Sequence, residues 1–163
     1  MKYPITVPSF QAVAAGQTAT VDLPASGTYH SLLVNYGTAA VGGANQVNTE
    51  AELDEFRLKV NGKVQRVHSS AELDTINAFY GYGFATGYQN IMLAQPWRRT
   101  SAGEDAPAWG MGDVDTFQLE VDINAAAANP TLDLKVLWTP DNRPMGPIVK
   151  WRRFVVPVTA AGI

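Results

Sequence analysis

The feature that most restricts the fold of this chain is an alternation of apolar and polar residues with a period of two. Between Phe117 and Ile123, for example, apolar side chains alternate with Gln118, Glu120 and Asp122. Successive side chains of a β-strand point to opposite faces of its sheet, so this pattern predicts strands with one face against a core and one in water. Clear or weaker versions of it predict eight strands, at residues 18–23, 29–36, 56–60, 63–67, 88–94, 117–123, 132–138 and 148–156.

The dipeptide Asn61-Gly62 lies between two of these strands and indicates a β-hairpin. A type I′ turn fits best, because both of its central residues need a positive φ. A two-residue turn would place Arg57 directly opposite Arg66, and facing like charges destabilise a strand pair. Two solutions remain open: the arginine pair lies at a solvated edge, or the turn is wider than two residues.

One helix is predicted from Ser69 onward, because Ser69 and Glu72 fit a capping box. Apolar residues at 73, 76 and 79 or 80 follow at helical spacing, and Gly81 is the expected end. A second helical turn is predicted within residues 124–130, where Pro130 prevents extension. Residues 37–51 and 96–113 are expected to be long loops.

Strands joined mostly without helices predict an all-β fold, because parallel α/β folds need a helix between most strands. We expect an eight-stranded antiparallel jelly-roll β-sandwich with one short inserted helix, formed by a single domain over residues 1–163. The side chains expected to fill its core are those of Ala19, Val21, Leu32, Val34, Leu58, Phe117, Leu119, Val121, Leu134 and Val136.

The composition limits the partners of this domain. The chain contains no cysteine and carries a net charge of −3, so it offers no disulfide, no thiolate metal site and no basic face for a polyanion. The amino terminus lacks the apolar segment of a signal peptide, and no apolar run approaches the roughly 20 residues of a membrane-spanning helix. We therefore predict a soluble domain that neither binds nucleic acid directly nor inserts into a membrane.

No combination of residues predicts a catalytic, cofactor or metal site, and we do not expect an enzyme. His30 and His68 are isolated along the chain, whereas a jelly-roll metal site needs several histidines and a carboxylate. No serine lies in a Gly-x-Ser-x-Gly motif. Acidic residues cluster at 50–55 and 104–115, where we expect solvated loop charge; a glycoside hydrolase using paired carboxylates is a third-ranked alternative.

Residues 79–88 contain five aromatic residues and three glycines, and two tryptophans follow in the next loop. Such a stretch fits packing beneath a loop, a protein interface, or a platform on which sugar rings stack. For an interface we expect contributions from aromatic and arginine side chains, namely those of Tyr82, Phe84, Trp97, Arg98, Arg99, Trp109, Arg152 and Arg153. The sugar platform supports the main alternative function, a carbohydrate-binding β-sandwich module.

Several segments, in this order along the chain, resemble the amino-terminal jelly roll of the major coat protein of corticoviruses. They are residues 13–24, 28–29, 58–64, 73–77, 119–127, 130–134 and 151–154. Corticoviruses are icosahedral, tailless bacterial viruses with an internal membrane, known also as integrated proviruses. The resemblance spans nearly the whole chain but depends on no single diagnostic motif.

The resemblance implies a structural protein of the virion that is made in the cytoplasm of a bacterial host. In that family two jelly rolls occur in tandem, and three chains form a pseudo-hexagonal capsomer. The expected partners are therefore copies of the chain itself, first in a homotrimer and then in the capsid lattice, together with other virion proteins. Because the sequence stops at Ile163, about where a second jelly roll should begin, we expect the amino-terminal half of a tandem coat protein.

Overall fold

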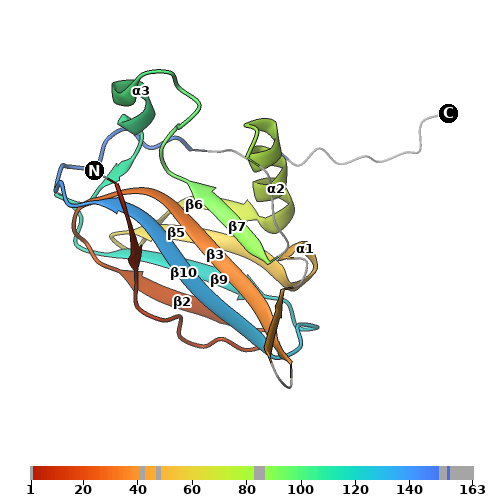
Figure 1. Ribbon diagram of the computed structural model, residues 1–163. Helices are drawn as coiled ribbons and strands as arrows, with labels where there is room; N and C mark the ends of the chain where they lie inside the picture. The colour runs from red at the N-terminus through yellow and green to blue at the C-terminus, as the bar shows by residue number, and fades with distance from the viewer. Residues whose placement is uncertain (1, 41–42, 47–48, 83–86, 151–153, 155–163) are drawn as a thin grey trace.

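The computed structural model describes residues 2–40, 43–46, 49–82, 87–150 and 154. They form two antiparallel sheets that pack face to face as a β-sandwich (Figure 1). The six-stranded sheet has the order β1-β10-β3-β4, with β7 and β8 also paired to β3. Its strands are β1 (Tyr3–Thr6), β3 (Thr28–Ala40), β4 (Gly43–Gln46), β7 (Tyr88–Met92), β8 (Trp109–Gly110) and β10 (Pro130–Thr139).

The four-stranded sheet has the order β2-β9-β5-β6. Its strands are β2 (Thr18–Leu23), β5 (Leu53–Val60), β6 (Lys63–Ser69) and β9 (Phe117–Ile123). Three helices are described: α1 (Thr49–Glu52), α2 (Ser70–Phe79) and α3 (Ser101–Asp105). The longer helix α2 contacts β5, β6 and β7, so it covers the side of the sandwich where β6 and β7 are the neighbouring strands (Figure 1).

The core lies between the sheets, and all ten side chains predicted for it are buried. They alternate with exposed or half-buried polar residues, as in β9, where every second side chain from Phe117 to Ile123 is buried. Trp109 is also part of this core: it has no exposed surface, and its ring lies 5.6 Å from that of Phe117. Trp109 is predicted to contribute to an interface, but β8 pairs with the buried start of β3 and the indole lies in the core instead.

The hairpin between β5 and β6 has the predicted two-residue turn. The φ angles of Asn61 and Gly62 are +48° and +73°, as a type I′ turn requires. The register then shifts between Leu58 and Lys59, which places Arg57 opposite Val67 and Arg66 opposite Leu58. This β-bulge separates the two arginines, so neither a solvated arginine pair nor a wider turn is needed. It also points Arg66 toward the interior, where it is 5% exposed.

The capping box of α2 is confirmed. The backbone N–H of Glu72 donates to Ser69 Oγ at 3.2 Å, and the Ser69 N–H donates to Glu72 Oε2 at 2.9 Å. The helix ends at Phe79, and Gly81 follows with a φ of +76°, a conformation in which glycine is the least strained residue. Helix α2 therefore begins and ends where the sequence predicts.

The predicted loops contain additional elements. Residues 37–51 include the end of β3, β4 and the start of α1, and residues 96–113 include α3 and β8. Residues 124–129 form a turn instead of a helical turn, because Asn124 Oδ1 accepts from the Ala126 N–H and Asn129 adopts a φ of +48°. Strand β10 then starts at Pro130.

The strand predicted at residues 148–156 is absent from its described part, residues 148–150 and 154; the other positions lie outside the described residues. The backbone carbonyl of Val149 accepts a hydrogen bond from the Arg66 side chain at 2.8 Å, so a guanidinium takes the place of a strand partner there. Within the described part of the chain, no helix has the length and apolar character needed to cross a membrane.

Candidate assembly surface

Four aromatic side chains meet beyond the carboxyl end of α2, and we call Phe79, Tyr80, Tyr82 and Trp97 the aromatic cluster. The Tyr80 and Trp97 rings stack with centroids 3.7 Å apart and an interplanar angle of 8°. Phe79 contacts Tyr80 edge to face at 5.2 Å, and Tyr82 lies 6.4 Å from Trp97 at 59°. The cluster joins α2 to the loop between β7 and α3, which runs above the sheets in Figure 1.

Hydrogen bonds fix the loop that carries Trp97. Arg98 donates twice to Gln95, from its backbone N–H to the carbonyl at 3.0 Å and from Nε to Oε1 at 2.6 Å. The N–H of Gln95 in turn donates to the Glu104 carbonyl in α3 at 3.0 Å. Thr100 caps α3 through its hydroxyl, which accepts from the Gly103 N–H at 3.2 Å. Trp97 is therefore presented by a braced loop.

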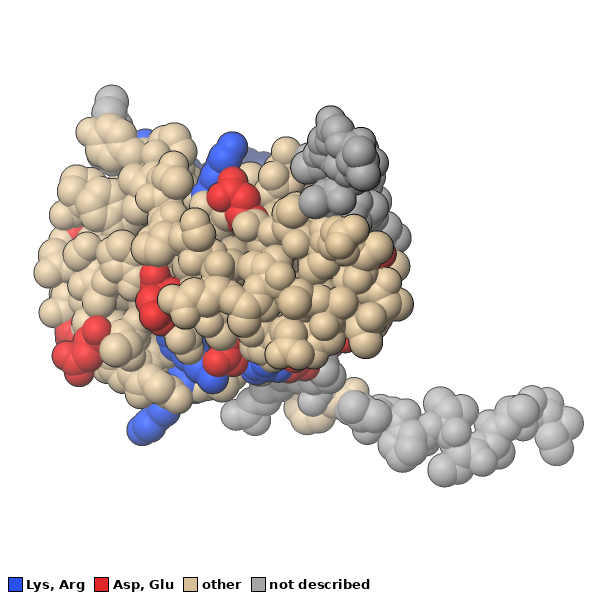
Figure 2. Space-filling model, turned by 90° about the horizontal axis from the view of Figure 1, so that it is seen from below, with Lys and Arg blue, Asp and Glu red and all other residues tan. Residues whose placement is uncertain are grey.

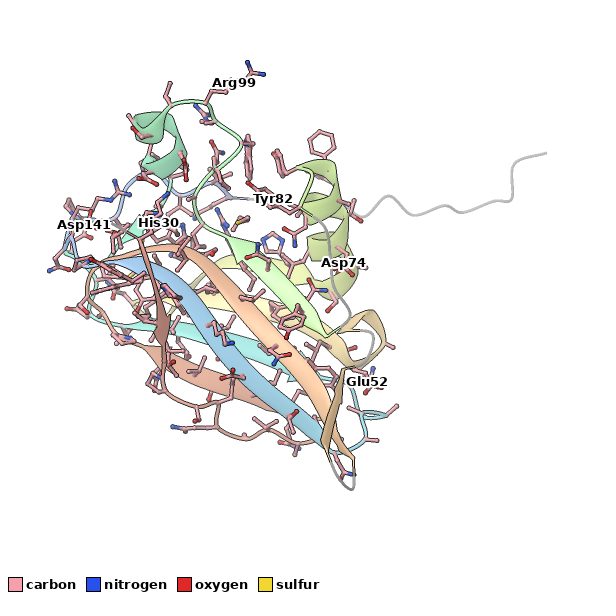
Figure 3. The ribbon with its side chains drawn as sticks, viewed as in Figure 1. His30, Glu52, Asp74, Tyr82, Arg99 and Asp141 are labelled. Carbon is pink, nitrogen blue, oxygen red and sulfur yellow. The ribbon has the colours of Figure 1, made fainter. Side chains whose placement is uncertain are left out.

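The aromatic cluster lies at the molecular surface. The Phe79 side chain is 82% exposed, Tyr82 and Trp97 are half-buried, and Arg98 and Arg99 are exposed. Figure 3 shows Arg99 extending from the top of the loop, away from the sandwich, with Tyr82 below it. Burial, with Glu104 nearby, raises the pKa of the Tyr82 phenol, so this group stays neutral near pH 7. Aromatic and arginine side chains are the types enriched in protein interfaces.

The structure brings together part of the predicted interface set. Tyr82, Trp97, Arg98 and Arg99 lie on this one surface, whereas Trp109 lies in the core. Phe84, Arg152 and Arg153 lie outside the described residues. The predicted interface set omits Phe79 and Tyr80, although the aromatic-rich stretch contains both. The signal that could have found them is the short α2 helix, which turns its last residues away from the core.

Both histidines are buried in the fold. His30 is 3% exposed and His68 is 4% exposed. His30 Nε2 lies 3.2 Å from the Thr139 hydroxyl, and Nδ1 lies 3.3 Å from Asp105 Oδ1. Burial lowers the pKa of His30, so the imidazole is neutral near pH 7. These contacts join β3 to α3 and to the end of β10, where Figure 3 shows His30 and Asp141 at the same end of the molecule.

Several residues of the two predicted acidic clusters bind neighbouring side chains. Lys2 Nζ lies 2.6 Å from Glu104 Oε1 and 2.9 Å from Asp105 Oδ1. Asp54 accepts from Asn124 at 3.0 Å, and Glu52 accepts from the Tyr36 hydroxyl at 3.2 Å. No group of three or more His, Cys, Asp or Glu side chains that could hold a metal ion occurs among residues that the structure describes.

On the outer face of the four-stranded sheet, Arg57 binds carboxylates on two strands. Its Nη1 donates to Glu55 at 2.9 Å and to Asp122 at 2.5 Å, and its Nε donates to Glu120 at 3.1 Å. The hydrogen bond from Arg57 lowers the pKa of Asp122. Burial alone would raise the pKa of Glu120, but hydrogen bonds from Lys59 and Arg57 hold it below its ordinary value. This network ties β5 to β9.

The strands pair in the orders β1-β10-β3-β7 and β2-β9-β5-β6, which is the arrangement of a jelly-roll β-sandwich. Comparison with known proteins agrees with this class. The model of the viral coat protein P2 N-terminal domain matches residues 4–137. The chain therefore belongs to the family of viral coat protein P2 N-terminal domains, which confirms the predicted resemblance to the amino-terminal domain of a viral coat protein.

Two solved structures share the fold. The major capsid protein P2 from bacteriophage PM2 has a TM-score of 0.74 at 19% identity, over 91% of this chain and 52% of that one. PBCV-1 VP54, fitted into a cryo-EM reconstruction of the virophage Sputnik, has a TM-score of 0.54 at 14% identity, over 85% of this chain and 41% of that one. The jelly-roll fold is thereby confirmed, and the chain spans about half the length of the first protein and about two fifths of the second. No curated protein matched the sequence.

Proposed function

We propose that this domain is a tile of a viral capsid and forms the amino-terminal half of a tandem double jelly-roll coat protein. Three copies would form a pseudo-hexagonal capsomer, and capsomers would join a lattice with other virion proteins. The family assignment supports this proposal, as does the 52% of the capsid protein P2 chain that this chain covers. The function is then geometric: a stiff sandwich holds its contact surfaces at fixed positions.

The main observation in favour of an assembly surface is that the large apolar side chain of Phe79 is exposed on a rigid support. Phe79 is 82% exposed, yet its neighbour Tyr80 is held by the stack on Trp97. A preordered cluster loses little side-chain entropy when a partner covers it, so more of its apolar burial contributes to binding. Arg98 and Arg99 border it, and Phe84, Arg152 and Arg153 remain proposed members of the interface.

We further propose that the domain is not an enzyme, does not bind nucleic acid directly and does not insert into a membrane. It would be made in the cytoplasm of a bacterial host and function in the virion. Figure 2 supports the proposal that the domain does not bind nucleic acid directly. On the face that it shows, lysine and arginine alternate with acidic residues and form no continuous basic surface. The carbohydrate alternative needs free ring faces, and Tyr80 and Trp97 cover one face of each other.

The assembly surface can be tested by sedimentation equilibrium of the protein encoded by the complete open reading frame. Phe79→Ser removes an exposed side chain, so the subunit should stay folded while the trimer weakens by about tenfold or more, as for a hot-spot residue. Val64→Ser is a matched control, because Val64 is also exposed, at 44%, but lies on the β5–β6 hairpin. Equal self-association of both variants and the wild type would show that the aromatic cluster is not part of the trimer interface.

A further inference from the structure

A cavity of about 230 Å³ lies between α2, β6 and β7, beneath the aromatic cluster. Apolar side chains from both sides line it, among them Leu73 and Ile76 of α2 and Ile91 of β7. The stacked pair Tyr80 and Trp97 also contributes to its wall. The volume is smaller than that of typical pockets for drug-sized molecules, which begin at about 300 Å³, so it suits a small ligand.

The cavity also contains a buried cation. Arg66 is 5% exposed and reaches the cavity from the inward face of β6, where the β-bulge directs it. Its Nη1 donates to the Met92 carbonyl at 2.6 Å and its Nε to the Val149 carbonyl at 2.8 Å. The guanidinium carbon lies 5.3 Å from the centre of the Trp109 ring. These partners are dipoles and a π face, so they offset the positive charge without neutralising it.

The described lining of the cavity carries an excess of positive charge. Its described residues include Arg66 and Lys150 but no aspartate or glutamate. A buried guanidinium that lacks a carboxylate loses hydration without a full Coulombic return. Burial accordingly lowers the pKa of Arg66 to about 10, although the group stays charged near neutral pH. An anion that enters the cavity would therefore contact a fixed positive charge and N–H donors that are poorly hydrated.

We propose that this cavity binds a small organic anion, a carboxylate with a compact apolar body. The carboxylate would lie against the Arg66 guanidinium, and the apolar body would pack between Ile76 of α2 and Ile91 of β7. Arginine and carboxylate form charge-assisted hydrogen bonds that are about twice as strong as neutral ones. No assembly step is required, so the site acts in the isolated subunit as well as in a capsomer.

Ligand-observed NMR and calorimetry with benzoate as the probe, and benzyl alcohol as its neutral counterpart, test this site on the full chain. We expect benzoate to bind with a Kd of about 1 mM or lower, at least about tenfold more tightly than benzyl alcohol. Equal affinity for the two compounds, or no benzoate binding, would overturn the proposal. Binding of an acidic peptide without binding of benzoate would also overturn it, because the ligand would then be a polypeptide.

Variants locate the binding. Arg66→Met should abolish the preference for benzoate; because Arg66 also holds two backbone carbonyls, this variant needs a folding check. Ile76→Trp keeps Arg66 and fills the cavity from α2, so it should weaken benzoate binding by about tenfold or more. Arg99→Met removes an exposed arginine outside the lining and should bind as the wild type does. Unchanged affinity in the folded Ile76→Trp protein would contradict the assigned position.

Discussion

Gly27 and Gly62 adopt almost the same left-handed backbone conformation, with φ of +72° and +73°, in different surroundings. A Cβ atom added at Gly62 would meet no atom within 4 Å. One added at Gly27 would lie 2.1 Å from Nε1 of Trp138, whose indole N–H donates to the Ser26 carbonyl at 2.8 Å. Gly27 therefore allows both the left-handed turn and the close approach of the Trp138 indole, whereas Gly62 allows only the turn.

Alanine at these two glycines should separate backbone strain from steric conflict. Both substitutions carry a similar penalty of about 1–2 kcal/mol for the left-handed conformation. Gly27→Ala must also displace Trp138, so its free energy of unfolding should fall by about 1–3 kcal/mol more than that of Gly62→Ala. Urea denaturation of both variants measures the difference. Equal stabilities would show that the Trp138 ring does not pack against Gly27.

At the scale of the element, α2 depends on its first turn. Ser69→Ala removes the hydroxyl that accepts from the Glu72 N–H and should cost about 1 kcal/mol of stability. Thr75→Ala is the matched control, because it removes an exposed hydroxyl that bonds within the helix, to the Ala71 carbonyl. Thermal denaturation should show a lower Tm for Ser69→Ala alone. A Tm loss of the same size in both variants would argue against the capping box.

The Arg57 network predicts how the pairing of β5 with β9 responds to acid. The pKa values of Glu120 and Asp122 are lowered in the folded protein, so their stabilisation is complete above the unfolded values of about 4. It is lost as the pH falls below those values and through the folded ones. Arg57→Gln should therefore reduce stability most near pH 7, and its curve should approach the wild-type curve in acid.

Urea denaturation between pH 7 and pH 3 tests that convergence. Lys135→Gln is a suitable control, because Lys135 is an exposed cation on β10 of the other sheet. Its difference from the wild type should stay small throughout this range. A constant difference between Arg57→Gln and the wild type at every pH would mean that the carboxylates do not depend on Arg57.

The elements that the sequence predicts well are those whose local pattern agrees with their burial. Strands β2 and β9 begin and end at the expected residues, and α2 is bounded by its own cap and by Gly81. Strands β1, β4 and β8 have two to four residues each, too few for an alternation to be recognised. At residues 148–156 the sequence predicts a strand that the described residues do not form. An apolar run does not reveal whether a partner strand is available.

The register of the β5–β6 hairpin could not be predicted from local sequence. The turn residues specify the type I′ conformation, but the shift between Leu58 and Lys59 depends on what the rest of the molecule offers to Arg66. Met92, Val149 and Trp109 supply that environment, and all three are far from Arg66 along the chain. The aromatic cluster could be predicted only in part for the same reason. The sequence shows the aromatic-rich stretch, but the stack of Tyr80 on Trp97 is a tertiary contact.

At the scale of the whole molecule, the sandwich is a continuous support for the aromatic cluster. Two sheets with a continuous core hold the aromatic cluster at one end, and helices α2 and α3 lie at this end as well (Figure 1). Assemblies of obligate subunits commonly bury about 2,000 Å² or more, so the cluster would be one part of a larger contact. A second jelly roll following this domain would supply more of that surface.

The most direct test of the capsid-tile account is native mass spectrometry of the protein made from the complete open reading frame. We predict a dominant species of three copies, each with a mass well above that of these 163 residues, as the proposed second jelly roll requires. A single-copy species that persists at high protein concentration, from a reading frame that ends at Ile163, would contradict the account.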